Sequence, residues 1–331
     1  MHVLIDNGVA LIIALQHAVG DWFIAPMWFF SYLGSEDFFL IAMPLIYWSV
    51  DSALGLQVMF VLIASNYLNH IFKLAFLGSR PYWISSHVEA IWKTEISFGI
   101  PSNHAQTAVA LWGTFAAYFK RTWVWVVSIV VMFLVGFSRI YLGVHFPHDV
   151  VVGWLLGAVV LWAFLHFWKP VEVWISGKST GQKILIAFVV SLILAAVGAG
   201  VTSLQSGFQI PETWISNSFL AGAATPDPLN QNNIFTLAGT LFGMATGAAW
   251  IKSMGGYQAS GPVWMRALRY VIGLVGILIF YMGLGAIFPR GDGFIYYFLR
   301  YIRYTVVGFW VGGGAPWLFM QLKIAGRSDA I

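Results

Sequence analysis

Long apolar stretches recur along the whole 331-residue chain, and they restrict its fold more than any other feature. Each is about 20 residues long, which is enough to cross a bilayer as a helix. Only 9% of the residues are charged, whereas soluble domains carry about a quarter. Strands of a membrane barrel would alternate apolar and polar side chains, and these continuous runs do not. The sequence therefore predicts an all-α fold, a polytopic transmembrane helix bundle.

The hydrophobic profile separates into predicted spans that fall into two groups. Six precede the polar break KPVEVWISGKSTGQ at 169–182, and four follow it. We therefore expect a six-span core at 1–168, a cytoplasmic linker at 169–182 and a four-span C-terminal membrane extension of unknown role at 183–331. Gly20, Asp21 and Pro26 interrupt the first span. The predicted spans cover residues 8–33, 36–50, 53–77, 103–119, 123–143, 148–168, 183–203, 233–251, 270–289 and 295–320.

Basic residues are unequally distributed between the two sides of this layout. One side collects ten Lys and Arg residues and the other only three, Arg80, Lys93 and Arg290. Cytoplasmic loops carry the excess of positive charge, so both termini are expected inside. No Lys or Arg precedes Lys73, so we expect no cleavable signal peptide. The layout places outside the cytoplasm the loops 78–102, 144–147, 204–232 and 290–294.

A first cluster of polar residues lies in the segment NYLNHIFKLAFLGSRP. Asn66, Asn69, His70 and Lys73 recur at the spacing of one helical face. A polar stripe inside a membrane span normally faces the protein interior and indicates function. His70 either orients Lys73 or hydrogen-bonds Asn66. Arg80 then follows at the outer surface.

A second cluster lies in the segment GIPSNHAQ. Pro101 fits the first turn of a helix, where its missing N–H costs nothing. Ser102, Asn103 and His104 would then stand beside backbone N–H groups that lack intrahelical partners. Such a helix N-terminus is a ready anion site.

The third cluster, SRIYLGVHFPHD, places Arg139 at the outer end of the fifth span. Pro147 begins the sixth span, so His145 precedes that helix and Asp149 lies in its first turn. All three clusters fall on the outer side of the predicted layout. Together they supply three cations, two histidines and a carboxylate, which suits a phosphoryl group that one histidine attacks while another protonates the leaving oxygen.

These motifs resemble a known signature. The pattern Lys-x6-Arg-Pro, Pro-Ser-x-His and Ser-Arg-x5-His-x3-Asp runs in order from Lys73 to Asp149. It is similar to the signature of the type 2 phosphatidic acid phosphatase superfamily, which includes membrane lipid phosphatases, glucose-6-phosphatase and vanadium haloperoxidases. The resemblance implies that residues 1–168 form a six-span phosphatase core.

The resemblance assigns phosphate binding to the lysine and the arginines of the first and third motifs, with help from the second. Lys73, Arg80 and Arg139 would hold the phosphate oxygens, helped by Ser102 and by the backbone N–H groups of residues 102–104. Asn103 is counted with this group, although it stands where the commonest family pattern has glycine. Its side chain would either crowd the phosphate or add a hydrogen bond, which bears on substrate choice more than on activity.

The resemblance also implies the catalytic roles. His145 would be the nucleophile and form a phosphohistidine, while Asp149 would hydrogen-bond its other ring nitrogen. His104 would protonate the leaving alkoxide and later help to activate water. Family members need no metal or other cofactor, and the sequence contains neither a cysteine nor a carboxylate cluster that would hold one.

Other polar residues have simpler interpretations. His17 and His166 are expected to be hydrogen-bonded interior residues, and His148 a polar residue at the membrane edge. Arg300 and Arg303 lie among four tyrosines. We interpret them as part of an interfacial belt, with a contact to an anionic lipid headgroup as the alternative.

The expected function is an integral membrane phosphatase of the bacterial plasma membrane, with its active site at the extracytoplasmic face. Its substrate would be a phosphatidate, a phosphatidylglycerol phosphate or a polyprenyl diphosphate, although a soluble sugar phosphate is also open. No nucleic-acid partner is expected. One alternative is a lipid phosphotransferase, which labelled-donor product analysis would separate from a hydrolase. The other is a transporter or flippase, disfavoured because no internal repeat is evident.

Overall fold

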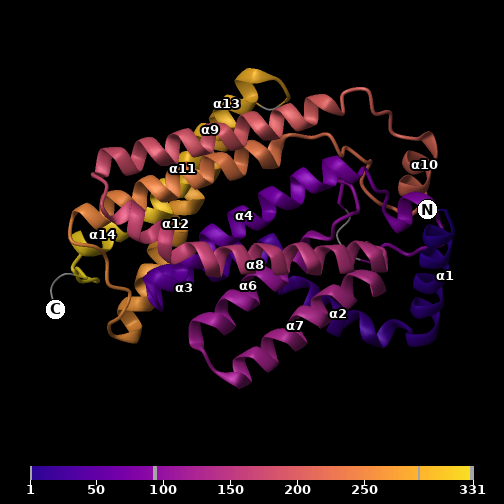
Figure 1. Cartoon of the computed structure of the whole chain (residues 1–331), viewed down its shortest axis with the longest axis horizontal. Helices are drawn as coiled ribbons and strands as arrows, with labels where there is room; N and C mark the ends of the chain where they lie inside the picture. The colour runs from indigo at the N-terminus through magenta and orange to yellow at the C-terminus, as the bar shows by residue number, and fades with distance from the viewer. Residues whose placement is uncertain (1, 92–94, 290, 329–331) are drawn as a thin grey trace. The chain divides into compact units, whose positions relative to one another are not determined.

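The computed structural model describes residues 2–91, 95–289 and 291–328. Lys93 and Arg290, which contributed to the predicted charge asymmetry, lie outside these residues. Within them every regular element is a helix, and the only β-type pairing is one isolated bridge between Gln258 and Gly326. Figure 1 follows the chain through these helices. The predicted all-α class is confirmed.

The chain divides into two compact units, and several helices contribute residues to both. Unit 1 comprises Met1–Phe39, Ala64–Leu165 and Val201–Asn230, and unit 2 comprises Leu40–Ile63, His166–Gly200 and Gln231–Ile331. The domains predicted from the sequence followed chain order, whereas the packing units do not. In chain order, the first elements are α1 (His2–Val19), η1 (Asp21–Phe23), α2 (Ile24–Tyr32), α3 (Glu36–Ser49) and α4 (Ser52–Phe76).

The remaining elements continue the same helical pattern. They are α5 (Pro81–Ile84), α6 (Asn103–Phe119), α7 (Thr122–Tyr141), α8 (Pro147–Ser176), α9 (Thr180–Leu204), α10 (Glu212–Leu220), α11 (Asn232–Ser253), α12 (Val263–Ile287), α13 (Phe294–Phe309), a π-helical turn η2 (Trp310–Gly314) and α14 (Ala315–Gln321). The expected linker at 169–182 is mostly helical, because α8 continues through Pro170 to Ser176.

Six helical segments among the described residues are long and apolar enough to cross a membrane, or seven if one bent pair counts as a span. The bent pair is the first predicted span, which turns by 94° between Val3–Val19 and Asp21–Tyr32. Gly20 at this break has φ 73°, a conformation that glycine adopts readily. The predicted spans 36–50 and 103–119 form the shorter helices α3 and α6, and the span 295–320 is divided among α13, η2 and α14, so their crossing of the membrane stays a prediction.

A close approach between α6 and α8 positions the candidate site in unit 1. A Cβ atom on Gly153 would lie 2.6 Å from the Ser102 carbonyl oxygen, and one on Gly157 would lie 2.5 Å from that of Gln106. The two backbones therefore touch where no side chain intervenes. This contact brings the first turn of α8 to the start of α6, where the Ser102 N–H donates to the Asp149 carbonyl at 2.9 Å.

Unit 2 is held together by glycines and by buried polar anchors. A Cβ atom on Gly243 of α11 would lie 2.1 Å from the Thr305 carbonyl oxygen of α13, so these helices also pack backbone to backbone. Trp48 donates its indole N–H to the Val311 carbonyl at 3.0 Å. The fully buried Arg269 donates to the carbonyls of Gln258, Ala259 and Ser260. These contacts hold the loop after α11 against α12.

The contact at Gly153 makes a stability prediction. Gly153→Val should destabilise the protein by about 1–3 kcal/mol, because the added methyl groups force α8 away from the Ser102 carbonyl. Gly200→Val is the matched control, since nothing lies within 4 Å of a Cβ atom at that position of α9. Thermal unfolding in detergent measures both. Equal midpoints for the two variants would contradict the close approach.

Candidate active site

Unit 1 brings together all eight residues that the sequence predicted as a site. They come from five helix ends: the last turn of α4, the start of α5, the start of α6, the last turn of α7 and the start of α8. Seven are buried, and Asn103 is half-buried. The eight residues are Lys73, Arg80, Ser102, Asn103, His104, Arg139, His145 and Asp149.

His145 is held on both of its ring nitrogens. Nδ1 lies 3.2 Å from the Asp149 Oδ2, and Nε2 lies 3.3 Å from the Arg80 Nη1. The same Asp149 oxygen accepts the Phe146 N–H at 2.9 Å, which fixes the carboxylate. Because a carboxylate accepts and a guanidinium donates, the geometry favours the tautomer with a proton on Nδ1 and a lone pair on Nε2.

The turn before α8 sets the position of His145. Gly143 has φ 72°, and a Cβ atom there would lie 2.2 Å from the Glu89 carbonyl oxygen. The N–H groups of Val144 and His145 both donate to the Arg139 carbonyl at 3.2 Å. The chain therefore folds back on the end of α7 and places His145 beside Arg139. Only glycine fits this turn without strain.

Burial keeps the His145 ring neutral. Loss of solvation is the main cause, followed by the positive charge of Arg80, and together they hold the pKa of His145 well below its ordinary value of 6.5. Nε2 is therefore unprotonated at neutral pH, and its lone pair faces the Arg80 guanidinium in the resting protein. A neutral imidazole whose Nδ1 is anchored can attack through Nε2 once a substrate takes the place of this contact.

The three predicted phosphate ligands converge on a carboxylate that the sequence reasoning missed. Glu95 Oε2 lies 2.7 Å from Arg80 Nη2 and 3.7 Å from Lys73 Nζ, and its Oε1 lies 3.0 Å from Arg139 Nη2. Burial opposes the charged form, but Arg80 and the other two cations outweigh it and hold the pKa of Glu95 well below 4.5. The carboxylate is therefore ionised. Its position in the polar loop 78–102 offered a weak signal, because Glu89 in that loop looks equivalent.

Ser97 is a second residue of the site that sequence reasoning missed. Its hydroxyl accepts from Lys73 Nζ at 2.8 Å and from Arg80 Nη2 at 3.2 Å. Its carbonyl accepts from Arg80 Nε at 2.7 Å. The loop at 95–98 thus contacts both Lys73 and Arg80. Arg80 makes a further bond from Nη2 to the Phe98 carbonyl at 3.2 Å.

Several buried polar atoms of the site have no hydrogen-bond partner among the described residues. These are the Ser102 hydroxyl, both ring nitrogens of His104, the Arg139 Nε and the Asp149 Oδ1, which lies 3.3 Å from the His148 Nε2. Buried polar atoms are nearly always satisfied, so a group of unsatisfied ones requires an explanation. A bound anion would satisfy the donors among them, because it can accept from the hydroxyl, from one imidazole N–H and from the guanidinium.

Asn103 and the polar stripe of α4 form a network of their own. The Asn103 amide donates to Asn66 Oδ1 at 2.7 Å, and Asn69 donates to the Gln106 Oε1 at 2.9 Å. The predicted inward orientation of the stripe is confirmed, since Asn69, His70 and Lys73 are all buried. These bonds tie α4 to α6. The Ser102 N–H, expected at the phosphate, instead donates to the Asp149 carbonyl.

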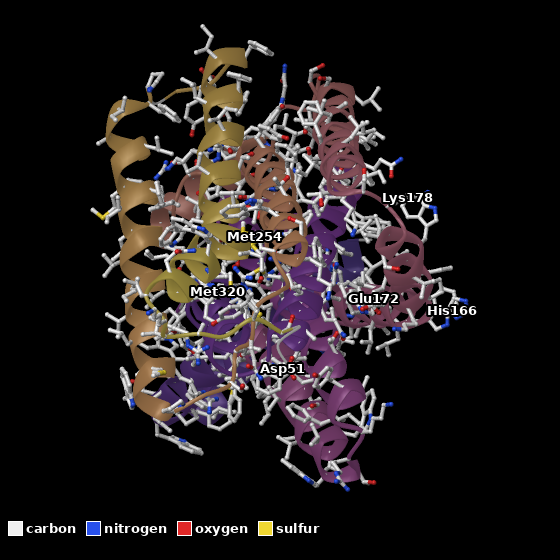
Figure 2. All side chains as sticks on the ribbon, turned by 90° about the vertical axis from the view of Figure 1, so that its left-hand side faces the viewer. Asp51, His166, Glu172, Lys178, Met254 and Met320 are labelled. Atoms are coloured by element: carbon white, nitrogen blue, oxygen red, sulfur yellow. The ribbon has the colours of Figure 1, made fainter. Side chains whose placement is uncertain are left out.

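The other histidines differ from expectation in part. His17 and His166 are exposed, so their prediction as interior residues is wrong: they lie on outward faces of α1 and α8, and Figure 2 shows His166 projecting from its helix. His148 stacks on Phe146 with ring centroids 5.2 Å apart, and its Nε2 lies 3.3 Å from Asp149 Oδ1. It therefore contacts the carboxylate that orients His145. The His70 Nε2 has no partner in the described residues.

Arg300 and Arg303 are both engaged by the protein. Arg300 donates to the Asn232 carbonyl and the Thr236 hydroxyl, at 3.0 and 2.9 Å. Arg303 donates twice to the Tyr281 carbonyl and lies 4.1 Å from the centre of the Tyr281 ring. Packing of arginine against tyrosine is what an interfacial belt predicts.

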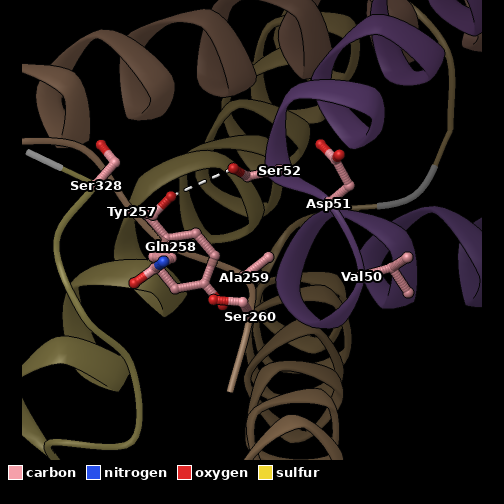
Figure 3. A pocket seen from close by; sticks show the side chains of 8 residues that line it. All are labelled: Val50, Asp51, Ser52, Tyr257, Gln258, Ala259, Ser260 and Ser328. Atoms are coloured by element: carbon pink, nitrogen blue, oxygen red, sulfur yellow. Dashed lines mark hydrogen bonds between the residues drawn. The ribbon is translucent and has the colours of Figure 1, made fainter. Parts of the chain in front are cut away.

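One cavity of about 260 Å³ lies in unit 2 (Figure 3). None of the eight predicted site residues lines it. Asp51 at its edge is the N-cap of α4, because its carboxylate accepts the N–H groups of Ala53 and Leu54 at 2.9 Å. The cavity is lined by Val50, Asp51, Ser52, Tyr257, Gln258, Ala259, Ser260 and Ser328.

Two models of known protein families match this chain. Residues 54–172 match the model of the PAP2 superfamily, and residues 235–327 match the model described as PAP2 superfamily phosphatase, transmembrane extension. The chain therefore belongs to the PAP2 superfamily. The first match contains all eight predicted site residues, and the second covers most of the C-terminal half.

Individual relatives are similar over part of their length. The chain is 30% identical to glucose-6-phosphatase 2 of Homo sapiens, over 50% of this chain and 55% of the relative. It is 28% identical to glucose-6-phosphatase 3 of Bos taurus, over 49% and 53%. It thus spans about half the length of the curated relatives it matches. A solved structure, the first transmembrane PAP2 type phosphatidylglycerolphosphate phosphatase from Bacillus subtilis, is 23% identical over 51% of this chain and 88% of its own, with a TM-score of 0.41.

The ion pairs of Glu95 make a pH-dependent stability prediction. Glu95→Gln should destabilise the protein by about 3 kcal/mol at neutral pH, because it leaves buried cations without their partner. The native pKa lies below the unfolded value, so this stabilisation is present above about pH 4.5 and is lost as the pH falls through the native pKa.

Thermal unfolding in detergent between pH 3.5 and pH 8 tests this, and the difference in stability between the two proteins should narrow as the pH falls below about 4.5. Glu172→Gln is the control, since Glu172 forms an exposed pair with Lys169 and such pairs contribute little. If the wild type were more stable than Glu95→Gln by the same amount at pH 3.5 as at neutral pH, the role of the ionised Glu95 in these ion pairs would be contradicted.

Proposed function

We propose that this chain is an integral membrane phosphatase that hydrolyses a lipid phosphate or diphosphate monoester through a phosphohistidine on His145. The observation that carries the proposal is the setting of His145, whose Nδ1 faces Asp149 and whose Nε2 faces Arg80 in a buried cluster of cations. Membership of a superfamily with a phosphatase branch supports the same chemistry.

In the first step, the Nε2 lone pair of His145 forms a bond to phosphorus while the bond from phosphorus to the leaving oxygen breaks. His104 gives a proton to that oxygen, which departs as an alcohol. Asp149 accepts the Nδ1–H bond and balances the positive charge that the ring gains. Lys73, Arg80 and Arg139 hold the phosphoryl oxygens where negative charge increases.

In the second step, water attacks the phosphorus of the phosphohistidine. His104 takes a proton from the water, a new P–O bond forms and the P–N bond breaks. His145 regains its lone pair, and phosphate leaves. The charges at the start and end of the cycle are therefore the same, and the chain's own residues supply both proton transfers.

The proposed substrate is a lipid, and the proposed active site opens on the extracytoplasmic side of the membrane. Lys73, Arg139 and Asp149 lie near the ends of long apolar helices, where a phosphate headgroup can enter while its acyl tail stays in the bilayer. The ten-to-three distribution of basic residues supports an outer position and cytoplasmic termini.

One observation favours a second substrate class, a soluble sugar phosphate. The relatives of 28% and 30% identity are named glucose-6-phosphatases. A phosphate-release screen of the purified protein against phosphatidate, phosphatidylglycerol phosphate, polyprenyl diphosphate and glucose 6-phosphate decides between the classes. A kcat/KM at least tenfold higher for a lipid supports the first proposal, and the reverse order supports the second.

The nucleophile and the proton donor have separable mutational effects. His145→Ala should abolish phosphate release, since no other group forms the covalent intermediate. His104→Ala should lower kcat by about 10²–10⁴-fold, the usual contribution of a general acid. His17→Ala is the control and should match the wild type, because His17 is exposed on α1. Full activity in the His145 variant would contradict the mechanism.

Inhibition provides an independent prediction. Vanadate should inhibit phosphate release, because it adopts the five-coordinate geometry that the phosphoryl group passes through at His145. Incubation with EDTA followed by its removal should leave kcat unchanged, since His145, His104 and the three cations supply the chemistry. Turnover is measured with the best substrate of the screen. Complete loss of activity after chelation would exclude the mechanism as written.

A further inference from the structure

Glu95 lies where the proposed mechanism needs the phosphate. Its Oε2 contacts Arg80 and approaches Lys73, while its Oε1 contacts Arg139. Oε1 also lies 3.7 Å from Nδ1 of His104, the proposed proton donor. One carboxylate thus bridges four groups that are each expected to act on a substrate phosphate. Two anions cannot occupy this position together.

We propose that Glu95 is an internal competitor of the substrate: its carboxylate occupies the phosphate position in the resting protein, and a phosphate binds by displacing it. This inference rests on the proposed function, since it takes the same cations to be the phosphate ligands. Glu95 then sets the affinity of the site and favours substrates that hold the cations more strongly than a single carboxylate does.

The loop that carries Glu95 is anchored on its backbone, which leaves the side chain as the moving part. The Glu95 N–H and carbonyl both bond to the Tyr82 hydroxyl, at 3.2 and 2.8 Å. The next residue, Ile96, accepts the Asp227 N–H on its carbonyl at 3.0 Å. The Glu95 side chain is 27% exposed, so it has an opening toward which it can rotate. Displacement then needs no change in the loop backbone.

Residues 201–230, here called the strap, contact both this loop and the neighbouring helix α5. Phe208 packs edge-on against Phe98 with ring centroids 5.3 Å apart, and Trp214 lies 5.1 Å from Trp83. Asn217 donates to the carbonyls of Trp83 and Ile84, at 3.0 and 2.9 Å. The strap lies between the two family matches, at 54–172 and 235–327. The position of Glu95 therefore depends on a segment that neither family match covers.

Competition from Glu95 has a defined energetic consequence. When only a fraction of the molecules has an open site, the apparent dissociation constant of a ligand rises by the inverse of that fraction. A phosphate carries up to two charges and more acceptor oxygens than a carboxylate. It can also accept from the Ser102 hydroxyl and from one N–H of the His104 ring, which have no hydrogen-bond partner among the described residues while Glu95 is in place. These additional bonds let phosphate displace the carboxylate.

The test is equilibrium binding of radiolabelled inorganic phosphate to the purified full chain in detergent. Glu95→Gln keeps the shape of the side chain and removes its negative charge. Glu95→Ser also shortens the side chain, so that it no longer reaches the cations. Both should bind phosphate about tenfold or more tightly than the wild type, because the competing anion is gone. Glu89→Gln is the matched control, an exposed carboxylate of the same outer loop, and should bind as the wild type does.

The outcomes separate this inference from the function on which it rests. Tighter binding in both Glu95 variants supports competition, since loss of a purely structural contact would weaken binding. Wild-type or weaker binding in both variants, with phosphate release intact in the wild type, overturns the competition alone. Absence of phosphate binding in every protein, together with no phosphate release in the substrate screen, overturns the proposed function and the competition with it.

Discussion

Three buried cations in an apolar chain are the constraint on which the rest of unit 1 depends. Lys73, Arg80 and Arg139 are each at most 5% exposed. Isolated charges in such surroundings are expensive, so each must have an anion or a set of hydrogen-bond acceptors nearby. Glu95 and Ser97 provide these in the resting protein. The same need for an anion is what makes the cluster a candidate phosphate site.

The backbone positions the histidine and the carboxylate of the site through a small number of close contacts. Gly153 allows α8 to touch the start of α6, and Gly143 allows the chain to reverse after α7. The first contact places Asp149 and the second places His145, so the pair that orients the imidazole is a consequence of helix packing. The loop at 95–98 then closes the cluster from the side of α5. The packing of unit 1 and the proposed chemistry therefore depend on the same few residues.

The sequence predicted the helices and the eight site residues because both leave a local signal. Long apolar runs predict membrane helices, and motifs with fixed spacing place Lys73, His104 and His145 at helix ends. Glu95 and Ser97 leave no such signal, because their roles come from a loop that folds back over the cations. The exposed positions of His17 and His166 were also missed, since the hydropathy of a span does not show which face a polar residue occupies.

The short helices explain why the count of spans could not be predicted as well as the fold class. α3, α6 and α13 have 14, 17 and 16 residues, and the apolar character of their sequences alone does not show where each ends. The π-helical turn at Trp310–Gly314 contains three glycines, and its Gly313 packs against Gly247 of α11. Such backbone contacts depend on the partner helix and leave only a weak pattern in one segment.

The central claim is that His145 carries the phosphoryl group, and mass spectrometry of the quenched protein tests it most directly. Phosphohistidine survives alkaline quenching, so the purified protein is mixed with its best substrate, quenched in base and digested. The account predicts added phosphate on the peptide that contains His145, at that ring, and none on His104. Steady release of phosphate with no phosphorylated His145 peptide at any time point, or with phosphate on another residue, would contradict it.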